Sequence, residues 1–253
     1  MENEREQLPR ATKELAERLD YVIAERARLR ESDDADATTQ FFSMCREYDK
    51  LTDNYDWNDE VFEENGKKGL RNVKGEVVVP AIYDDFLMLE PYYYKSHPVG
   101  AVLGDMAGLV ARDGTGTPVT EFEYCLVAPI FMTPFHAVWK AEYGRYFALM
   151  VADKVITPYE IEEFDIPCDG VLPLYADGKK GMLAYDLGLI YIKPEYDDIH
   201  GGGIGEDFIF VKDGKKGRVT LDKRFVSDEE FSNLSEEEQD ELCDEGFISS
   251  PYL

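Results

Sequence analysis

A five-residue phrase that occurs three times constrains the fold of this chain more than any other feature of its sequence. Residues 177–181 and 213–217 both read Asp-Gly-Lys-Lys-Gly, and residues 65–69 read Asn-Gly-Lys-Lys-Gly. Each copy lies between two short apolar runs. Asn-Gly or Asp-Gly between such runs is typical of a two-residue β-hairpin turn, because both central positions require a positive φ. Three copies of one hairpin indicate a repeat protein.

The sequence around these phrases continues as a longer repeat with an alternating apolar pattern from about residue 59 onward. After the hairpin, each complete copy has a second turn, a further apolar strand and an acidic corner, which reads Tyr-Asp-Asp at 83–85 and at 196–198. Two looser copies run over about 99–124 and 146–164. The second glycine of the phrase, or the residue in its place, recurs every 33 to 40 residues: Gly69, Gly108, Ala148, Gly181 and Gly217. We therefore expect five units of three strands each, which form an antiparallel meander of about fifteen strands.

Each part of the repeat has a physical role that accounts for it without any binding function. The first glycine permits the turn, and the second permits a close backbone approach or a β-bulge on the return strand. The proline before the corner cannot donate a hydrogen bond to a strand ladder, so it ends the strand or places it at an edge. The tyrosine packs over the core, and the aspartates accept hydrogen bonds in the turn. We therefore expect the Asp-Asp pairs to be structural.

This repeat resembles the WG-repeat (KWG) family, whose units read approximately as apolar strand, Asn/Asp-Gly-Lys-Trp-Gly, strand, Lys-Gly-Lys, apolar strand, Pro and Tyr-Asp-Asp. The resemblance covers about residues 59–231 and is closest in the first, fourth and fifth copies. The chain departs from the family before the second glycine, where the tryptophan is replaced by Lys68, Ala107, Phe147, Lys180 and Lys216. The resemblance implies a bacterial, non-catalytic interaction module.

Helical spacing is confined to the two ends of the chain. Residues 5–31 carry an apolar stripe with Glu/Arg pairs on the other faces, and a second amphipathic segment follows the acidic connection at 32–36. We expect a helical hairpin that caps the first repeat, because the ends of repeat arrays need covering. A parallel coiled-coil dimer is the alternative. A short helix is expected at 235–243, with Ser235 and Glu238 as its capping box.

The predicted fold is therefore mainly β with α appendages. It is a five-unit antiparallel β-meander repeat array with an N-terminal helical hairpin and a short C-terminal helix. We divide the chain into a helical cap, residues 1–56, and a WG-like array with a C-terminal helical lid, residues 57–253. Three strands per unit and unequal repeats favour an open, twisted array over a closed propeller.

The net charge of −26 over 253 residues limits the partners that the chain can have. Such a surface repels phosphate backbones and anionic bilayers, so we predict no nucleic-acid partner and no membrane partner. It favours a basic protein or divalent cations. The alternative is that the charge only keeps an edge-rich β protein soluble. Residues 53–60 are rich in oxygen ligands but lack the spacing of a calcium-binding loop, so we expect ordinary turn chemistry there.

The cysteines and the N-terminal residues bear on the compartment. Cys45, Cys125, Cys168 and Cys243 are far apart, and no pair has the spacing of a zinc site or a redox motif. We expect reduced, mostly buried thiols. The charged N-terminal residues do not resemble a secretory signal, and no apolar run is long enough to span a membrane. These features predict a cytoplasmic protein with no metal and no cofactor.

Two aromatic, proline-containing inserts interrupt the array, at 89–98 and at 129–139. Inserts of this kind tend to lie on one face of a repeat array, often the binding face, and exposed tyrosines are enriched at interfaces. The candidate partner-binding residues in the two inserts are Tyr92, Tyr93, Tyr94, His97, Phe131, Phe135 and Trp139. The alternative is that both inserts fold over the two looser repeats and replace their missing core.

The sequence contains no nucleophile elbow, phosphate-binding loop or dinucleotide-binding motif, so we predict no catalytic residue. We expect a non-catalytic, acidic protein-protein interaction module with a basic protein as its partner. One alternative is a carboxylate-dependent hydrolase acting on carbohydrate, which needs two carboxyl groups about 5 to 10 Å apart in a cleft. Another is an immunity-type protein that neutralises a basic toxin. The sequence predicts no particular oligomeric state.

Overall fold

The structure is a computed structural model, and it describes four stretches of the chain: residues 8–32, 36–168, 170–201 and 207–249. The chain divides into two compact units, residues 1–129 (unit 1) and residues 130–253 (unit 2). The division after residue 56 stays a prediction, and the predicted helical cap belongs to unit 1 together with the first repeats.

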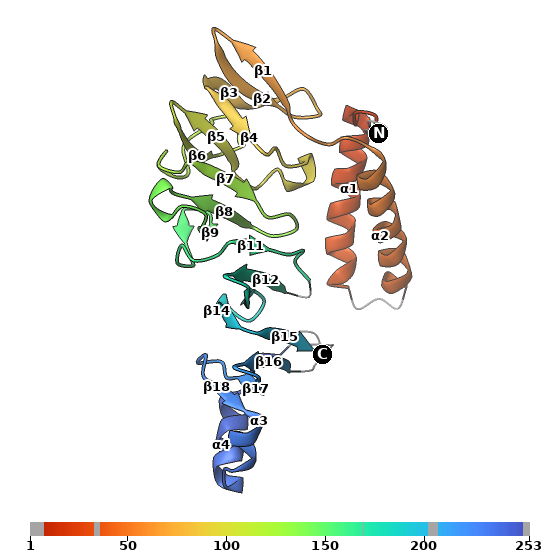
Figure 1. Ribbon diagram of the computed structural model, residues 1–253. Helices are drawn as coiled ribbons and strands as arrows, with labels where there is room; N and C mark the ends of the chain where they lie inside the picture. The colour runs from red at the N-terminus through yellow and green to blue at the C-terminus, as the bar shows by residue number, and fades with distance from the viewer. Residues whose placement is uncertain (1–7, 33–35, 169, 202–206, 250–253) are drawn as a thin grey trace, which may run out of the picture. The chain divides into compact units, whose positions relative to one another are not determined.

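The predicted fold class is confirmed. Strands dominate, with a helical pair in the N-terminal part and short helices in the C-terminal part (Figure 1). The described strands form five antiparallel sheets of three or four strands each. The elements of unit 1 are α1 (Lys13–Arg30), α2 (Ala37–Asn54), β1 (Glu60–Glu64), β2 (Lys67–Arg71), β3 (Val77–Tyr83), β4 (Asp85–Leu87), η1 (Tyr92–Tyr94), β5 (Val99–Leu103), β6 (Met106–Val110) and β7 (Leu126–Pro129).

Unit 2 continues the meander, so that strands next to one another in sequence are hydrogen-bonded neighbours in its sheets. Its elements are β8 (Phe135–Trp139), η2 (Ala141–Tyr143), β9 (Phe147–Val151), β10 (Lys154–Val155), β11 (Glu163–Phe164), β12 (Val171–Ala176), β13 (Lys179–Ala184), β14 (Ile190–Tyr196), β15 (Asp198–Gly201), β16 (Phe208–Lys212), β17 (Lys215–Val219), β18 (Phe225–Ser227), α3 (Asp228–Ser232) and α4 (Glu236–Glu245). Buried clusters lie between successive sheets, for example around Leu149, Leu172 and Leu183.

The three hairpins have the predicted turn geometry. Both central residues have positive φ in every copy: Asn65 and Gly66, Asp177 and Gly178, Asp213 and Gly214. At the second glycine of the fourth copy, Gly181, the register between β13 and β14 shifts, which confirms the predicted β-bulge. A Cβ atom on Gly181 would lie 2.5 Å from the Ile192 carbonyl oxygen and 2.6 Å from the Pro194 nitrogen. The opposite backbone therefore occupies the space of a side chain, and only glycine fits.

The acidic corner passes the chain from one sheet to the next. β3 ends at Tyr83, and β4 begins at Asp85 but pairs with β5, the first strand of the following repeat. In the same way β14 ends at Tyr196, and β15 begins at Asp198 and pairs with β16. The short strand that ends each sequence repeat therefore belongs to the sheet of the following repeat, so repeat and sheet boundaries differ by one strand.

The helical pair is confirmed, but the first helix begins later than predicted. The predicted start at residue 5 lies outside the described residues, and residues 8–12 are not helical. The Thr12 hydroxyl caps α1 by accepting a hydrogen bond from the Leu15 N–H, and the Ala11 N–H donates to a carbonyl oxygen of the segment after α2. The cap satisfies one of the free N–H groups of the first turn and so sets where the helix begins.

The two helices pack on the first repeat and the first insert of unit 1, as the cap hypothesis predicts. Leu19 of α1 and Leu51 of α2 belong to one buried cluster with Trp57 and Tyr92, and Val73 of the first repeat packs at its edge. The Trp57 ring N–H donates a hydrogen bond of 2.9 Å to the Leu51 carbonyl oxygen. This cluster joins the helical pair to the β part of unit 1.

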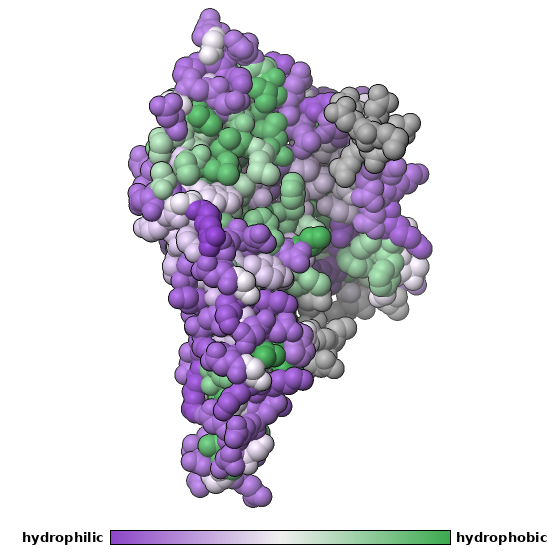
Figure 2. Space-filling model, viewed as in Figure 1, coloured by the Kyte–Doolittle hydropathy of each residue, from purple (hydrophilic) through white to green (hydrophobic). Residues whose placement is uncertain are grey.

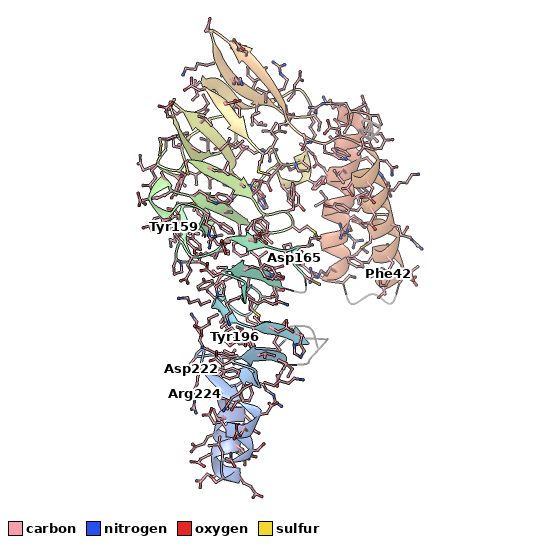
Figure 3. The ribbon with its side chains drawn as sticks, viewed as in Figure 1. Phe42, Tyr159, Asp165, Tyr196, Asp222 and Arg224 are labelled. Carbon is pink, nitrogen blue, oxygen red and sulfur yellow. The ribbon has the colours of Figure 1, made fainter. Side chains whose placement is uncertain are left out.

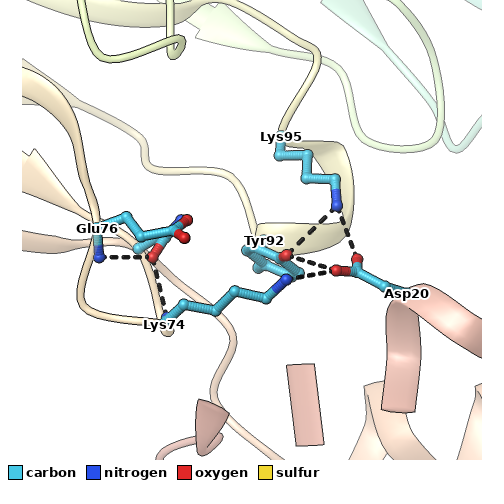
Figure 4. Close-up of polar contacts among 6 residues, drawn as sticks. Asp20, Lys74, Glu76, Tyr92 and Lys95 are labelled. Carbon is cyan, nitrogen blue, oxygen red and sulfur yellow. Dashed lines mark hydrogen bonds and ion pairs between the residues drawn. The ribbon is translucent and has the colours of Figure 1, made fainter. Parts of the chain in front are cut away.

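A polar network beside this cluster centres on Asp20 of α1 (Figure 4). The Nζ atoms of Lys74 and Lys95 lie 2.6 Å and 2.7 Å from its two carboxylate oxygens, and the Tyr92 hydroxyl donates to one of them at 2.9 Å. Burial by itself would raise the pKa of Asp20, but these three hydrogen bonds outweigh it and lower that pKa. The carboxylate therefore stays charged and ties α1 to both the first repeat and the first insert.

The segment after the last helix pairs with the last sheet, at Thr220–Phe247 and Asp207–Ser249, and the helical lid stays a prediction. Helix α4 has the predicted capping box of Ser235 and Glu238 and ends at Gly246. After it, the Ile248 N–H donates to the Val219 carbonyl oxygen at 2.8 Å. Ile248 is fully buried in the cluster that contains residues of both the β12–β14 sheet and the last sheet.

One element near this end differs from the expectation. The sequence suggests that residues 228–231 repeat the acidic corner, but they form the helix α3 instead. The Ser227 hydroxyl accepts a hydrogen bond from the Glu230 N–H, and all three residues of the first turn are acidic, which suits the positive end of a helix. This local capping accounts for the helical conformation.

Candidate protein-interaction surface

The lysines of the hairpin phrase are paired with the aspartates of the acidic corner in the same repeat. In the first and fourth repeats the ion pairs are Lys67–Asp84 (2.5 Å), Lys68–Asp85 (2.7 Å), Lys179–Asp197 and Lys180–Asp198 (2.6 Å). The lysine before the second glycine, which replaces the tryptophan of the WG-repeat phrase, is one member of each set. These cations are therefore engaged within the repeat and do not offset the acidic surface elsewhere.

The first aspartate of each corner also reaches the next repeat. Asp84 accepts a hydrogen bond of 2.8 Å from the Gly104 N–H, and Asp197 accepts one of 3.1 Å from the Gly214 N–H. Both glycines lie in the hairpin turn of the following repeat, so the predicted role of these aspartates in turn hydrogen bonding is confirmed. We call this carboxylate, with its lysine and its turn N–H, the corner staple.

A third corner staple is present in the looser third repeat, with different residues. Glu162 accepts a hydrogen bond of 2.5 Å from the Asp177 N–H, which opens the turn of the fourth repeat, and it forms an ion pair with Arg145. A carboxylate and a cation therefore recur at this position although the sequence there no longer reads Tyr-Asp-Asp. The staple is a structural device of the array.

The corner staple predicts a pH-dependent effect of Asp197→Asn. The hydrogen bond from Lys179 and the Gly214 N–H lower the pKa of Asp197. A lowered pKa stabilises the fold above the unfolded pKa of about 3.9, and the contribution is lost as pH falls through the folded value. We expect the variant to unfold at a lower temperature than the wild type at pH 7, and the two midpoints to converge below pH 4, as measured by circular dichroism.

The matched control is Asp153→Asn, in the exposed β9–β10 turn of the same unit, for which the structure describes no ion pair or side-chain hydrogen bond. Its midpoint should follow the wild type at both pH values. A difference between Asp197→Asn and the wild type that persists unchanged at low pH would contradict the ionic origin of the staple.

The largest unbalanced charge lies on α3 and α4. Residues 228–245, which we call the acidic helices, contain ten Asp and Glu residues and no Lys or Arg. Those described as exposed are Asp228, Glu229, Glu230, Glu236, Glu237, Glu238, Asp240, Glu241 and Asp244. In Figure 2 the surface over these helices is mostly hydrophilic, with small apolar spots.

Only part of this charge has a described cationic partner. Glu229 pairs with Lys215 at 3.2 Å, and Glu230 pairs at 2.6 Å with Arg224, which is labelled in Figure 3. The acids in the first turn of α4 suit the positive end of that helix, but Glu241 and Asp244 lie toward its negative end, where no basic residue is present. Acidic residues at that end oppose the helix dipole, so helix stability does not account for them.

A small hollow lies beside α3. Its volume is about 270 Å³, and its lining residues are Arg218, Val226, Asp228, Phe231, Ser232 and Phe247. The Arg218 guanidinium lies 5.8 Å and 5.4 Å from the ring centres of Phe231 and Phe247, so the hollow combines aromatic faces with charge.

The predicted aromatic residues of the first insert mainly hold unit 1 together. Tyr92 is buried in the cluster under the helical pair, and Tyr93 is half-buried against Tyr48, with ring centres 6.1 Å apart. Tyr94 stacks on His97 at 5.3 Å. Their packing agrees with the alternative in which the insert adds to the core.

The candidate residues of the second insert belong to unit 2, whereas those of the first insert belong to unit 1. Phe135 is buried in the core, and Trp139 is half-buried with its ring centre 4.8 Å from that of Phe147. Phe131 differs from both because it is 52% exposed. Of the seven predicted residues, Phe131 is the one that the structure describes as exposed.

Sequence reasoning missed a buried charge cluster in unit 1. Arg112 donates to the Asp59 carboxylate at 2.7 Å, and the two side chains are only 2% and 1% exposed. The Glu90 side chain is 2% exposed and lies 3.3 Å from the His97 ring. One polar atom each on Asp59, Glu90 and Arg112 is buried with no hydrogen-bond partner among the described residues. Burial raises the pKa of Asp59, and the nearby Arg112 acts in the opposite direction.

Three residues of the acidic stretch at 53–60 have structural roles. Trp57 enters the core, Asp59 pairs with Arg112, and the Asp56 side chain accepts a turn hydrogen bond from the Asn58 N–H.

In the part of the chain that the structure describes, no group of three His, Cys, Asp or Glu residues is arranged to hold a metal ion. Among those same residues, no helix is both long and apolar enough to cross a lipid bilayer.

The expectation of mostly buried thiols is wrong. Cys125, Cys168 and Cys243 are exposed, and Cys45 is half-buried. The three exposed cysteines lie in connections or on the acidic helices, where no core is available to cover them.

Comparisons of the chain with protein-family models, with curated proteins and with solved structures found no match. The resemblance to the WG-repeat family therefore stays a prediction.

Proposed function

We propose that this chain is a WG-repeat-like, non-catalytic interaction module of the cytoplasm, and that its acidic helices bind a basic protein. The observation that supports this most directly is the exposed carboxylates of residues 228–245, which have no Lys or Arg among them. Some of them oppose the dipole of the helix that carries them. Residues that break a local stability rule without a structural gain are expected at functional sites.

The chemistry of the surface limits the class of partner. A net charge of −26 attracts a basic protein and speeds its association, and it repels nucleic acid and anionic lipid. Ion pairs already engage the hairpin lysines of the first and fourth repeats, whereas residues 228–245 contain ten Asp and Glu residues and no Lys or Arg. The immunity-type hypothesis is one form of this proposal, in which the basic partner is a toxin.

We expect the variant Asp240→Asn, Glu241→Gln, Asp244→Asn to separate binding from stability. Neutral residues remove repulsion with the negative end of α4, so the thermal midpoint should stay unchanged or rise. Binding to the partner should weaken by about tenfold at 150 mM salt, because each lost surface charge pair contributes up to about 1 kcal/mol. The partner is obtained by affinity capture on the full chain, identified by mass spectrometry and purified, and binding is measured by calorimetry.

The matched control neutralises three exposed carboxylates on the edge strand β1, as Glu60→Gln, Glu63→Gln, Glu64→Gln. It changes the net charge by the same amount in unit 1 and should retain most of the affinity. The proposal fails if capture yields no basic protein, or if both variants weaken binding equally, since the charge would then act only through the total field of the chain.

The carbohydrate hydrolase alternative has no specific support. None of the hollows described on this chain is lined by more than one carboxylate, whereas such an enzyme needs two facing the same cleft.

A further inference from the structure

A tight turn at the start of unit 2 displays two large apolar side chains. Residues 130–133 form a β-turn in which the Thr133 N–H donates to the Ile130 carbonyl oxygen at 3.2 Å, and the Ile130 N–H bonds to the Phe135 carbonyl oxygen at 2.9 Å. The two central residues, Phe131 and Met132, are 52% and 69% exposed. We call them the apolar tip.

The turn is held rigidly from below. Thr133 is buried, and its hydroxyl donates to the Ile130 carbonyl oxygen at 2.7 Å and accepts from the Phe135 N–H at 3.2 Å. Phe135 itself is part of the core of unit 2. The apolar tip is therefore fixed in one conformation before any contact is made, which reduces the entropy that a partner must remove on binding.

The backbone of the apolar tip breaks a local rule. Met132 has φ of +65°, at the position that a type II turn normally gives to Gly or Asn. A bulky residue with positive φ is strained, and its exposed side chain gains nothing from burial. Leu189 of the same unit shares this strain and exposure, so the strain supports a function here only together with the exposed Phe131 on the same turn.

The surroundings of the apolar tip in the sequence are also unusual. Residues 125–139 contain no Asp, Glu, Lys or Arg, although charged residues make up 32% of the chain. Exposed Phe and Met side chains on a rigid support have the properties of interface anchors, which fill a pocket on the other protein. The same acidic charge that disfavours an anionic bilayer favours a protein as the occupant.

We infer that the apolar tip, Phe131 and Met132, is an anchor that inserts into an apolar pocket on the basic protein partner. This inference rests on the proposed function, because the partner is the protein that the acidic helices attract. The acidic helices supply long-range attraction, and the apolar tip supplies a contact that salt does not screen.

The experiment uses the full chain and the purified partner obtained by capture. Met132→Gly relieves the positive φ, so its thermal midpoint should rise by about 2 °C. The same variant, and Phe131→Ser, should weaken partner binding by about tenfold or more, with the same factor at 150 mM and 500 mM salt. A variant that is more stable yet binds less tightly has lost an interface contact and not its fold.

The matched control is Leu189→Gly, at another exposed apolar residue of unit 2 with positive φ. It should raise the midpoint similarly and leave binding unchanged. If the α4 variant (Asp240→Asn, Glu241→Gln, Asp244→Asn) weakens binding but the two apolar-tip variants bind as the wild type does, this inference alone fails. If the α4 variant also binds normally, the proposed function fails. Two results with Phe131→Ser would overturn the inference. If the wild type binds phosphatidylcholine vesicles and the variant does not, the apolar tip contacts a membrane. If the wild type self-associates in sedimentation and the variant does not, the apolar tip contacts a second copy of the chain.

Discussion

Arg112→Met should lower the free energy of unfolding by about 4 kcal/mol, the largest effect that we expect from a single substitution in unit 1. Removal of one partner of a buried ion pair typically lowers stability by about 3–5 kcal/mol, because the other charge stays buried without its counter-ion. Here the Asp59 carboxylate would remain 1% exposed, and the Tyr94 carbonyl oxygen would lose a hydrogen bond. Urea unfolding followed by circular dichroism measures the change.

The effect should depend on pH in a defined direction. Burial already raises the pKa of Asp59, and loss of the Arg112 charge removes a contribution that lowers it. Asp59 will therefore take up a proton more readily in the folded variant than in the unfolded chain. The difference between variant and wild type should shrink as pH falls from 7 toward 4, because a neutral carboxyl tolerates burial better.

Two further variants test this account. Arg224→Met breaks the exposed ion pair with Glu230 and should change stability by less than about 1 kcal/mol. Asp59→Leu combined with Arg112→Met should recover much of the loss, because an apolar pair of similar volume often replaces a buried ion pair without penalty. If Arg112→Met is no more harmful than Arg224→Met, the cluster is not buried as described.

Gly181→Ala should lower the free energy of unfolding by about 3 kcal/mol, the second large effect. The added Cβ would meet three backbone atoms of β14 at 2.5–2.7 Å, and backbone cannot move aside as a flexible side chain can. Overpacking at such sites typically lowers stability by about 1–3 kcal/mol, and the β-bulge would have to shift as well. The thermal midpoint should fall by roughly 9 °C for a chain of this length.

The third repeat provides the control for this substitution. Ala148 occupies the corresponding position, but it pairs with Val138 of β8 in regular register, and no bulge is described there. Ala148→Gly should therefore change stability by about 1 kcal/mol only, mainly through backbone entropy. If the two substitutions change the free energy of unfolding equally, the close backbone approach at Gly181 is not the reason that this position requires glycine.

The elements that the sequence predicts correctly are those specified by neighbouring residues. Asp177 and Gly178 determine their hairpin because few residue pairs accept two positive φ values in succession. Ser235 and Glu238 determine the start of α4 through a capping box that spans four residues. The same local chemistry at Thr12 begins α1, and it was missed only because the apolar stripe continues past the cap.

The features that could not be predicted depend on residues far apart in the chain. Asp59 and Arg112 are 53 residues apart, and nothing near either residue shows that they meet in the core. The passage from Tyr83 into the sheet of the next repeat is invisible for the same reason, because Asp85 is compatible with a turn or a strand. In the second insert, Phe131 and Phe135 are alike in sequence, and only the fold separates the exposed ring from the buried one.

The offset between repeat and sheet bears on how such an array can grow during evolution. Sheets in unit 2 are continuous in sequence from just after one acidic corner to the next, as in residues 163–196 and 198–227. A gene duplication with both ends at corners would insert one intact sheet together with the carboxylate that fastens it to its successor. A duplication that begins at the first strand of a hairpin would separate β15 from β16 and leave a strand edge exposed. Viable changes in the number of repeats should therefore have their junctions at the acidic corners.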